Sequence, residues 1–307
     1  MQQVIRDLIY VRFSVPDLQQ QKSFIEDFGL QAAITGNRLV ARGTDAAAFI
    51  YLAEQGEPAF TGIGFEASSL AALEAIAAID GVAVEDSDLP GGGKIARLND
   101  PSGHRVEVVW GMTKQAPLAT ADRSPLNNGR ATPRKGERVT LTTADAIVKR
   151  LGHCVLMVKD FRESEAWYKT RFGLITSDEI FVPQEDGEFT LGAFMRCDRG
   201  DDYVDHHTLF LIHTGKAEFN HAAFEVADWD VLMKSHYDLG RAGYKHSFGV
   251  GKHVLGSQVF DYWKDPNGFM LEHFTDGDLF NVASGSFRKP IGEMMGSLWG
   301  PDGGPGQ

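Results

Sequence analysis

The stretch VFDYWKDPNGFMLEHFTD, from Val259 to Asp276, decides how this chain folds. β-Branched and aromatic residues flank a Pro-Asn-Gly turn, a pattern that predicts a β-hairpin. Glu272 lies in the middle of the second strand, close to Leu271 and Phe274. A carboxylate on a strand that a sheet should bury is costly unless it is paired or bound to a cation. The partner of Glu272 is therefore the first thing to look for in the rest of the sequence.

The composition is that of an ordinary globular protein, with 43% hydrophobic and 23% charged residues in a chain of 307. A net charge of −12 without any Lys/Arg cluster argues against nucleic acid or an anionic membrane surface as a partner. The first residues lack a secretory pattern, and no run of about 20 apolar residues occurs. Cys154 and Cys197 are too few for a disulfide framework. These features predict a cytoplasmic protein.

One pattern occurs twice in the chain. Residues 10–30 and 153–174 each read as a strand followed by a helix-like stretch that ends in Phe-Gly-Leu. Further on, the sequence GIGFE at 62–66 resembles HAAFE at 221–225. Each of these is followed by an amphipathic helix, predicted over 68–79 and 228–241. Finally, DPSGHRVE at 100–107 matches DPNGFMLE at 265–272.

This order of elements predicts an α+β fold with two tandem modules, each a pair of strand-helix-strands units. We expect the first module over 1–112 and the second over 148–283. Residues 113–147, with three prolines and an Asn-Asn-Gly turn, read as an exposed linker. The Gly/Pro-rich segment 284–307 reads as a C-terminal tail that frays at its very end.

The two copies differ in three residues that suit a metal. Where the first copy has Tyr10, Gly62 and Glu107, the second has His153, His221 and Glu272. Two imidazoles and one carboxylate with open positions are the preferred site of a non-haem Fe(II) that binds substrate and dioxygen. Zn or Mn accepts the same ligand types, so the ligands alone leave the metal open.

Further polar residues accompany these three in the second copy. His253 and Tyr262 fall on the two arms that precede Glu272, where both can approach one cavity. We expect His206 and His207 to open a strand, and because side chains alternate across a strand, one of them should face the cavity. The residues themselves do not decide which one.

Residues 150–278 resemble the catalytic module of the type I extradiol catechol dioxygenases, in the vicinal oxygen chelate superfamily. The motifs that carry the resemblance occur in the family's order: Leu151-Gly152-His153, His206-His207-Thr208, Asn220-His221 with Phe224-Glu225, His253, Tyr262, and Asp265-Pro266-x-Gly268 through Glu272. The duplicated chain with a metal-free first module is also an arrangement of that family.

The resemblance implies a role for each matching residue. His153, His221 and Glu272 would hold Fe(II), with Mn(II) as the alternative. Tyr262 would hydrogen-bond a substrate oxygen, and His253 would do the same or orient bound oxygen. The acid/base residue would be His207, by its place before Thr208, with His206 as the alternative. The first module would be structural, and its Glu107 would need Arg12, Arg105 or His104 as a partner.

The implied activity is cleavage of a catechol-type ring beside its diol, with both atoms of O2 inserted, in the breakdown of aromatic compounds. A loose likeness of residues 256–281 favours a monocyclic, polar-substituted catechol or a trihydroxytoluene type. The partners are then an aromatic diol and O2, and we expect a homo-oligomer. The alternatives are a hydroquinone-cleaving dioxygenase, a glyoxalase-like isomerase or lyase, and a non-catalytic binding module. Candidates for the ring pocket are Phe189, Phe194, Phe248, Val250 and Trp263, with Lys252 as a candidate partner for a substrate carboxylate.

Overall fold

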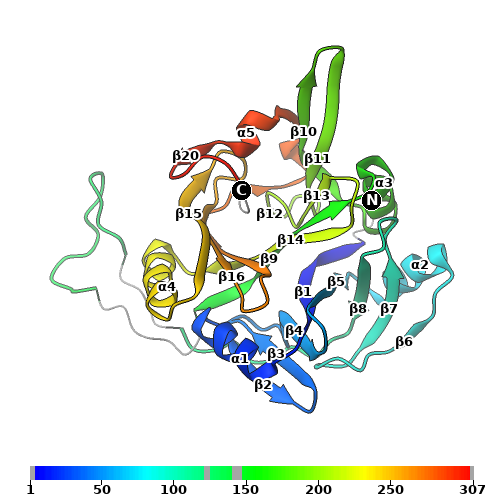
Figure 1. Cartoon of the computed structure of the whole chain (residues 1–307), viewed down its shortest axis with the longest axis horizontal. Coiled ribbons are helices and arrows are strands. Elements are labelled where there is room, and N and C mark those ends of the chain that lie inside the picture. The colour runs from blue at the N-terminus through cyan, green and yellow to red at the C-terminus, as the bar shows by residue number, and fades with distance from the viewer. Residues whose placement is uncertain (1–3, 121–124, 140–146, 305–307) are drawn as a thin grey trace.

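A computed structural model describes residues 4–120, 125–139 and 147–304. Two large sheets, each accompanied by helices, lie side by side, and residues 125–139 loop out from them (Figure 1). Among the described residues, no helix has both the length and the apolar character needed to cross a membrane.

The first sheet has eight strands in the order β2-β3-β4-β1-β5-β8-β7-β6. Two strand-helix-strands units build it. The first unit is β1 (Ile5–Val15), α1 (Leu18–Asp27), β2 (Gln31–Thr35), β3 (Arg38–Arg42) and β4 (Tyr51–Gln55). The second unit is β5 (Ala59–Ala67), α2 (Leu70–Asp80), β6 (Val84–Asp86), β7 (Lys94–Asn99) and β8 (Arg105–Trp110).

The second sheet repeats this plan. Its first unit is β9 (Val148–Val158), α3 (Phe161–Phe172), β10 (Ile175–Gln184), β11 (Gly187–Arg196) and β13 (Leu209–His213), with the short β12 (Val204–Asp205) before β13. Its second unit is β14 (Glu218–Val226), α4 (Trp229–Arg241), β15 (Lys245–His253), β16 (Val259–Lys264) and β17 (Met270–Thr275). The central strand order, β10-β11-β13-β9-β14-β17-β16-β15, matches that of the first sheet strand for strand. The α+β class with two tandem modules is therefore confirmed.

The segment after residue 276 takes part in the second sheet, which the sequence did not indicate. Its elements are β18 (Leu279–Phe280), the 3-10 turn η1 (Val282–Ser284), β19 (Phe287–Pro290), α5 (Ile291–Met295) and β20 (Ser297–Trp299). β19 pairs with β10 at one edge of the sheet and β20 pairs with β15 at the other, while β18 pairs with β12. The expected fraying of the last residues, 305–307, lies outside the described residues.

Local sequence explains where the helices begin and end. The Asp160 side chain accepts a hydrogen bond from the Glu163 amide at the start of α3, and Asp228 does the same for Val231 at the start of α4. Gly173 ends α3 at a φ of 68°, a left-handed conformation that glycine adopts without strain. The repeated Phe-Gly-Leu motif thus marks the return from helix to sheet.

The expected linker has no helix or strand over its described part, residues 113–120 and 125–139. Its first residues lie on the first module, where the amides of Gln115 and Leu118 donate to the carbonyls of Ala46 and Thr44. Residues 121–124 and 140–146 of the expected linker lie outside the described residues.

The two modules share one continuous apolar core. Phe13 of β1 packs against Phe219 of β14, with ring centroids 5.2 Å apart. Polar contacts also cross the boundary, because Gln21 of α1 donates to Asp265 Oδ2 at 2.9 Å and accepts from Asn267 at 2.8 Å. The turn between β16 and β17 is therefore held by the first module.

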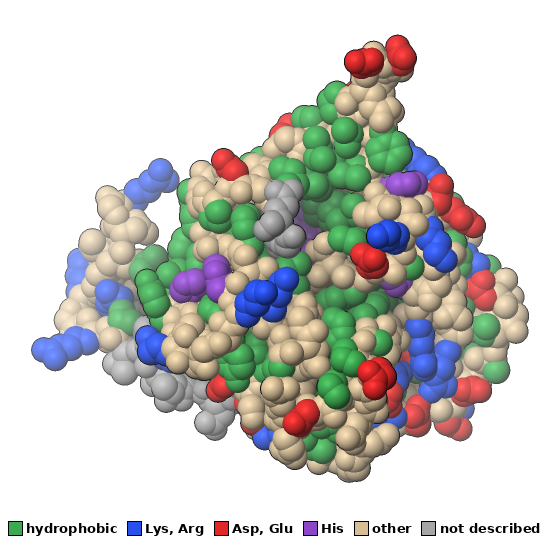
Figure 2. All heavy atoms as spheres, in the orientation of Figure 1, with side chains coloured by type: hydrophobic (Ala, Val, Ile, Leu, Met, Phe, Trp, Pro, Cys, Tyr) green, Lys and Arg blue, Asp and Glu red, His purple; other side chains and the backbone are tan. Residues whose placement is uncertain are grey.

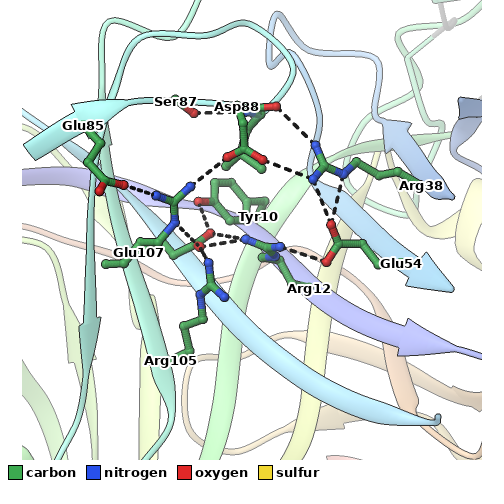
Figure 3. Close-up of polar contacts among 11 residues, drawn as sticks. Tyr10, Arg12, Arg38, Glu54, Glu85, Ser87, Asp88, Arg105 and Glu107 are labelled. Carbon is green, nitrogen blue, oxygen red and sulfur yellow. Dashed lines mark hydrogen bonds and ion pairs between the residues drawn. The ribbon is translucent and has the colours of Figure 1, made fainter. Parts of the chain in front are cut away.

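At the centre of the first sheet, an arginine network surrounds the buried carboxylate of Glu107 (Figure 3). The Tyr10 hydroxyl donates to Glu107 at 2.7 Å, Arg12 Nη1 donates at 2.7 and 2.9 Å, and Arg105 donates as well. Burial by itself raises the pKa of Glu107, but Arg12 and the other donors outweigh it and hold the pKa below its usual range. Arg12 and Arg105 were two of the three expected partners; the third, His104, instead lies 2.8 Å from the Met157 carbonyl oxygen.

Further charged residues surround this network and balance the charges of its arginines. Arg12 and Arg38 both contact Glu54, and Arg38 and Arg97 both contact Asp88. The network as a whole sets four arginines against four carboxylates (Figure 3). The arginines are Arg12, Arg38, Arg97 and Arg105, and the carboxylates are Glu54, Glu85, Asp88 and Glu107. Fixed guanidinium groups thus meet the charge of Glu107, and it requires no metal.

Arg12→Ala should reduce the free energy of unfolding by about 3–5 kcal/mol, because it leaves Glu107 buried without its main counter-charge. Lys22→Ala, which removes a more exposed pair with Glu26, should cost about 0.5 kcal/mol or less. Urea denaturation of both variants and the wild type measures the difference. Equal losses for the two variants would contradict the role given to Arg12.

Asp265→Asn should change the pH dependence of stability. Burial raises the pKa of Asp265 to about 6, above its value in an unfolded chain, so stability from the protonated carboxyl is present below about pH 4 and is lost as pH rises through about 6. Relative to wild type, the variant should gain about 1 kcal/mol of unfolding free energy between pH 5 and pH 8, since it lacks this ionisation. A difference that stays constant between the two pH values would rule this out.

Candidate metal centre

Three adjacent strands of the second sheet carry the expected metal ligands. His153 lies on β9, His221 on β14 and Glu272 on β17, and β14 pairs with both of the others. In this register Ala223 of β14 stands opposite both His153 and Glu272. His221 precedes Ala223 by two residues and therefore shares its face of the sheet. Strand pairing alone brings the three side chains to one face.

The three side chains meet closely and deep in the protein. The Nε2 atoms of His153 and His221 lie 3.3 and 3.2 Å from Glu272 Oε2. The exposed fractions of the three residues are 2%, 7% and 0%. All their ligand atoms fall within 4.8 Å of one another, which suits one shared cation.

The environment of the Glu272 carboxylate supports a bound cation at this site rather than an ion pair between protein side chains. Both of its carboxylate oxygens are buried without a hydrogen-bond partner among the described residues. Burial by itself raises the pKa of Glu272, but the two imidazoles outweigh it and hold the pKa well below its usual range. A buried, ionised carboxylate that accepts no hydrogen bond is costly unless a cation meets it. The donor set of two imidazoles and one carboxylate fits Fe(II), Mn(II) or Zn(II).

The same positions in the first sheet explain why that sheet needs no metal. Tyr10 stands opposite Gly64, as His153 stands opposite Ala223, and Glu107 occupies the place of Glu272. A Cβ atom at position 64 would fall 2.1 Å from the Tyr10 ring, so glycine leaves room for the hydroxyl to reach Glu107. The two modules therefore offer the same buried carboxylate to different counter-charges.

A partly open cavity of about 190 Å³ lies above the three candidate ligands. His207, His253 and Tyr262 also reach it, together with the neutral amides of Asn220 and Gln258. Its walls are otherwise mostly apolar: Val155, Phe194, Phe210, Ile212, Leu255, Met294 and Met295. On the face seen in Figure 2, hydrophobic side chains are correspondingly dense around α5 and the base of the β10–β11 hairpin.

Asn220 was not singled out as a site residue by the sequence. Its Oδ1 lies 2.7 Å from His221 Nδ1, so it accepts a hydrogen bond from that nitrogen and leaves Nε2 to face Glu272. A second partner of this kind fixes the ring orientation and tautomer of a metal-binding histidine. The pair Asn220-His221 could have suggested this, although adjacent residues on a strand ordinarily point to opposite faces.

Tyr262 and His253 form a pair at the wall of the cavity. Tyr262 stands opposite Glu272 in the β16–β17 pairing, and its hydroxyl lies 3.0 Å from His253 Nε2. Burial lowers the pKa of His253 to about 4, and burial also raises the pKa of Tyr262 above its usual value. Both groups are therefore neutral at pH 7, and the hydroxyl keeps a proton to donate.

His206 and His207 lie in the bend between β12 and β13, not in a strand as expected. The structure brings His207 to the cavity, with its ring centroid 4.0 Å from that of His153, and turns His206 away. His206 Nε2 lies 2.7 Å from Asp178 Oδ2, and its Nδ1 lies 3.1 Å from Nδ1 of His207. Asp178, which lies on the separate strand β10, was not expected at the site.

This chain of contacts defines how the protons are arranged. If Asp178 accepts the Nε2 proton of neutral His206, then His206 Nδ1 accepts from the Nδ1 proton of His207. The remaining nitrogen, His207 Nε2, is then unprotonated. Burial, followed by the neighbouring imidazoles, lowers the pKa of His207 well below its usual value, which agrees with a neutral ring.

Several expected cavity residues lie elsewhere. Of the five aromatic and apolar candidates, only Phe194 lines the cavity. Phe189 packs on His213, Phe248 stacks on Phe260, and Trp263 is buried in the main core; Val250 packs at the edge of that core. Lys252 does not line the cavity either, because its ammonium is paired with Asp276. The cavity was harder to predict than the ligands because its walls come from many separate segments.

The C-terminal segment closes the cavity. Met294 and Met295 of α5 line it together with Gly303 and Gly304. The Gly303 amide donates to the Met295 carbonyl, and β20 holds the segment against β15. This wall was not expected, since the Gly/Pro-rich composition of the tail indicated no packed structure.

Comparison with known proteins agrees with this architecture. Residues 150–273 match the model of the Glyoxalase/Bleomycin resistance protein/Dioxygenase superfamily. The chain is also similar to Metapyrocatechase 2 of Cupriavidus necator, with 28% identity over 306 residues that cover 97% of this chain and 90% of the relative.

Solved structures share the fold at low identity. The Mn(II)-bound glyoxalase from Novosphingobium aromaticivorans superimposes with a TM-score of 0.78 at 20% identity, covering 97% of this chain and 92% of that one. The 2,3-dioxygenase LapB from Pseudomonas sp. KL28 gives 0.76 at 17%, covering 93% and 97%. Homoprotocatechuate 2,3-dioxygenase from Arthrobacter globiformis gives 0.74 at 19%, covering 94% and 85%. The segment that matches the superfamily model, residues 150–273, thus carries all three candidate ligands, and the solved structures share its fold.

Proposed function

We propose that this chain is an extradiol dioxygenase that cleaves a catechol ring beside its diol and inserts both atoms of O2. His153, His221 and Glu272 would hold Fe(II), with Mn(II) as the alternative metal. The observation that carries the proposal is the buried carboxylate of Glu272, which accepts no hydrogen bond and faces two imidazoles below an apolar cavity. The similarity to Metapyrocatechase 2 over almost the whole chain supports the same activity.

Fe(II) in such a site supplies a Lewis acid that favours the ionised catechol and open positions at which substrate and O2 meet. The protein residues bind and orient the ring and manage its protons. His207 Nε2, as the free nitrogen of a neutral imidazole, can take the proton from a catechol hydroxyl and return it to an oxygen later in the reaction. Asp178 and His206 act through His207, because they fix its tautomer.

Tyr262 and His253 are suited to hold the other side of the substrate. The Tyr262 hydroxyl can donate to a catecholate oxygen, and His253 Nε2 lies near enough to orient that hydroxyl. Because the Glu272 carboxylate neighbours Tyr262, the phenol resists ionisation and stays a donor. A donor fixed before the substrate arrives needs little reorganisation when charge develops on the substrate oxygen.

The cavity favours a neutral catechol with an apolar substituent over a carboxylated one. Within the described part of the chain no lysine or arginine lines it, and its amides, Asn220 and Gln258, carry no charge. Desolvating a substrate carboxylate there without a counter-charge would be costly. The polar substituent expected from the sequence is the alternative.

A glyoxalase-like isomerase is the second candidate, because the fold is shared with a glyoxalase structure. It is disfavoured by the donor set, in which one module supplies two imidazoles and a single carboxylate. An isomerase consumes no O2, so oxygen uptake separates the two.

The first test is oxygen uptake by the Fe(II)-loaded chain with simple catechols. Wild type should consume O2 and form a yellow ring-opened product, whereas His221→Ala should lose both by at least about 100-fold, because a ligand is missing. His213→Gln, which changes a histidine outside the cavity, should behave as wild type. Failure of iron-loaded wild type to consume O2 with any catechol or hydroquinone would leave the isomerase or binding-module alternatives.

Substitution of His207 should lower the catalytic rate more than substitution of the adjacent His206. His207→Gln should lower kcat by about 100-fold or more, since it removes the proton acceptor and donor. His206→Gln should lower it less, because His207 remains and loses only its fixed tautomer. Steady-state kinetics on both, with bound iron measured in each preparation, make the comparison. A larger loss in His206→Gln would reverse the two assignments.

Substrate preference should follow the lining of the cavity. A catechol with an alkyl substituent should give a kcat/KM at least about tenfold higher than one with a carboxylate of similar size, because the carboxylate meets no cation. Lys252→Ala should leave the KM for the carboxylated catechol unchanged, since Lys252 is engaged with Asp276. Preference for the carboxylated substrate would show that a cation reaches the cavity.

A further inference from the structure

A second group of two histidines and one carboxylate lies away from the cavity. His236 comes from α4, His246 from β15 and Asp261 from β16, and their ligand atoms lie within 4.8 Å of one another. Asp261 directly precedes Tyr262 on β16, so its side chain points to the opposite face from the cavity. Figure 2 shows histidine side chains at the surface over α4 and β15.

We propose that His236, His246 and Asp261 form a second metal site, for a borderline divalent cation such as Zn(II), which ties α4 to the β15–β16 hairpin. Two imidazole nitrogens and a carboxylate oxygen from three separate elements converge on one point, a ligand set typical of zinc with a water as the fourth ligand.

The distances are close to those of a loaded site. His246 Nε2 lies 2.8 Å from Asp261 Oδ1, and His236 Nδ1 lies 3.2 Å from both carboxylate oxygens. Ligands bound to one tetrahedral zinc at about 2.0–2.2 Å are about 3.3 Å apart. The imidazole nitrogens therefore already lie near the spacing from Asp261 that a bound ion requires.

The surroundings of Asp261 also resemble those of a metal-binding carboxylate. Asp261 is fully buried, and Trp263 Nε1 donates to its Oδ2 at 2.6 Å, which fixes the carboxylate from behind. The side chains of His236 and His246 are 24% and 33% exposed, so a hydrated ion can reach them. A buried carboxylate behind two accessible imidazoles gives the site an entry path.

The site differs from the first centre in a way that predicts weaker binding. Asp261 already accepts hydrogen bonds from both histidines, whereas Glu272 accepts none. Metal binding must displace those two protons, which costs affinity and makes binding weaker at low pH. The alternative is a hydrogen-bonded His-Asp-His cluster that only packs α4 against the sheet.

The test is zinc binding by the iron-loaded, tag-free chain dialysed without oxygen against low micromolar Zn(II). Elemental analysis of both metals should give one more zinc per chain in wild type than in His246→Gln, and His236→Gln should match His246→Gln. His213→Gln, a histidine outside the cluster, should retain the wild-type zinc content. Iron content and the rate of ring cleavage should be the same in all four proteins.

Equal zinc content in wild type and His246→Gln would overturn the proposal and leave a hydrogen-bonded cluster. The same follows if zinc enters only by displacing iron. The measured quantity is the difference in zinc content between wild type and variant. The test of the zinc site therefore stays valid even if the chain proves not to cleave catechols. Both substituted histidines are partly exposed, and circular dichroism of each variant checks that the fold is kept.

Discussion

A carboxylate buried at the centre of a sheet needs a positive partner, and this requirement shapes both halves of the molecule. Glu107 and Glu272 occupy equivalent places on the parallel partners of β5 and β14. Neither is exposed to solvent. An ionised carboxylate in such a place costs several kcal/mol unless it is neutralised in place. The residues around Glu107 differ from those around Glu272 because the two modules neutralise the carboxylate in different ways.

In the first module, the positive partners of Glu107 are side chains that are always charged. Arg12 and Arg105 contact Glu107, Tyr10 fills the space where a histidine would stand, and Gly64 makes room for its ring. In the second module the arginines are absent and two imidazoles take their place beside Glu272. Unlike a guanidinium, an imidazole carries no permanent positive charge. Such a site is therefore open to an exchangeable cation, which a reactive centre requires.

The remaining polar residues of the cavity lie on two different sides, and in the proposed function each side has its own role. His207 lies on one side with Asp178 and His206 behind it, and the Tyr262–His253 pair lies on another. Apolar residues of β9, β11, β13 and α5 line much of the cavity around these groups. Low polarity strengthens each of the few polar contacts that a bound diol can make.

The sequence predicted the repeated fold and the three candidate ligands because both depend on local order. Phe-Gly-Leu and Asp-Pro-x-Gly mark the same turns in each copy, and comparison of the copies isolates His153 and His221. It could not identify Asp178 behind His206, since that contact joins separate strands. It also could not place Met294 and Met295 at the cavity or pair Lys252 with Asp276, because composition says little about where a tail packs or which charges meet.

In the proposed reaction, residues of the second module alone direct both atoms of O2 into an opened ring. Mass spectrometry of the product that the Fe(II)-loaded chain forms from an alkyl-substituted catechol under ¹⁸O2 tests this directly. We expect a ring-opened product that carries two labelled oxygen atoms, with none formed by Glu272→Ala. A product with an intact ring, or one without label from O2, would contradict it.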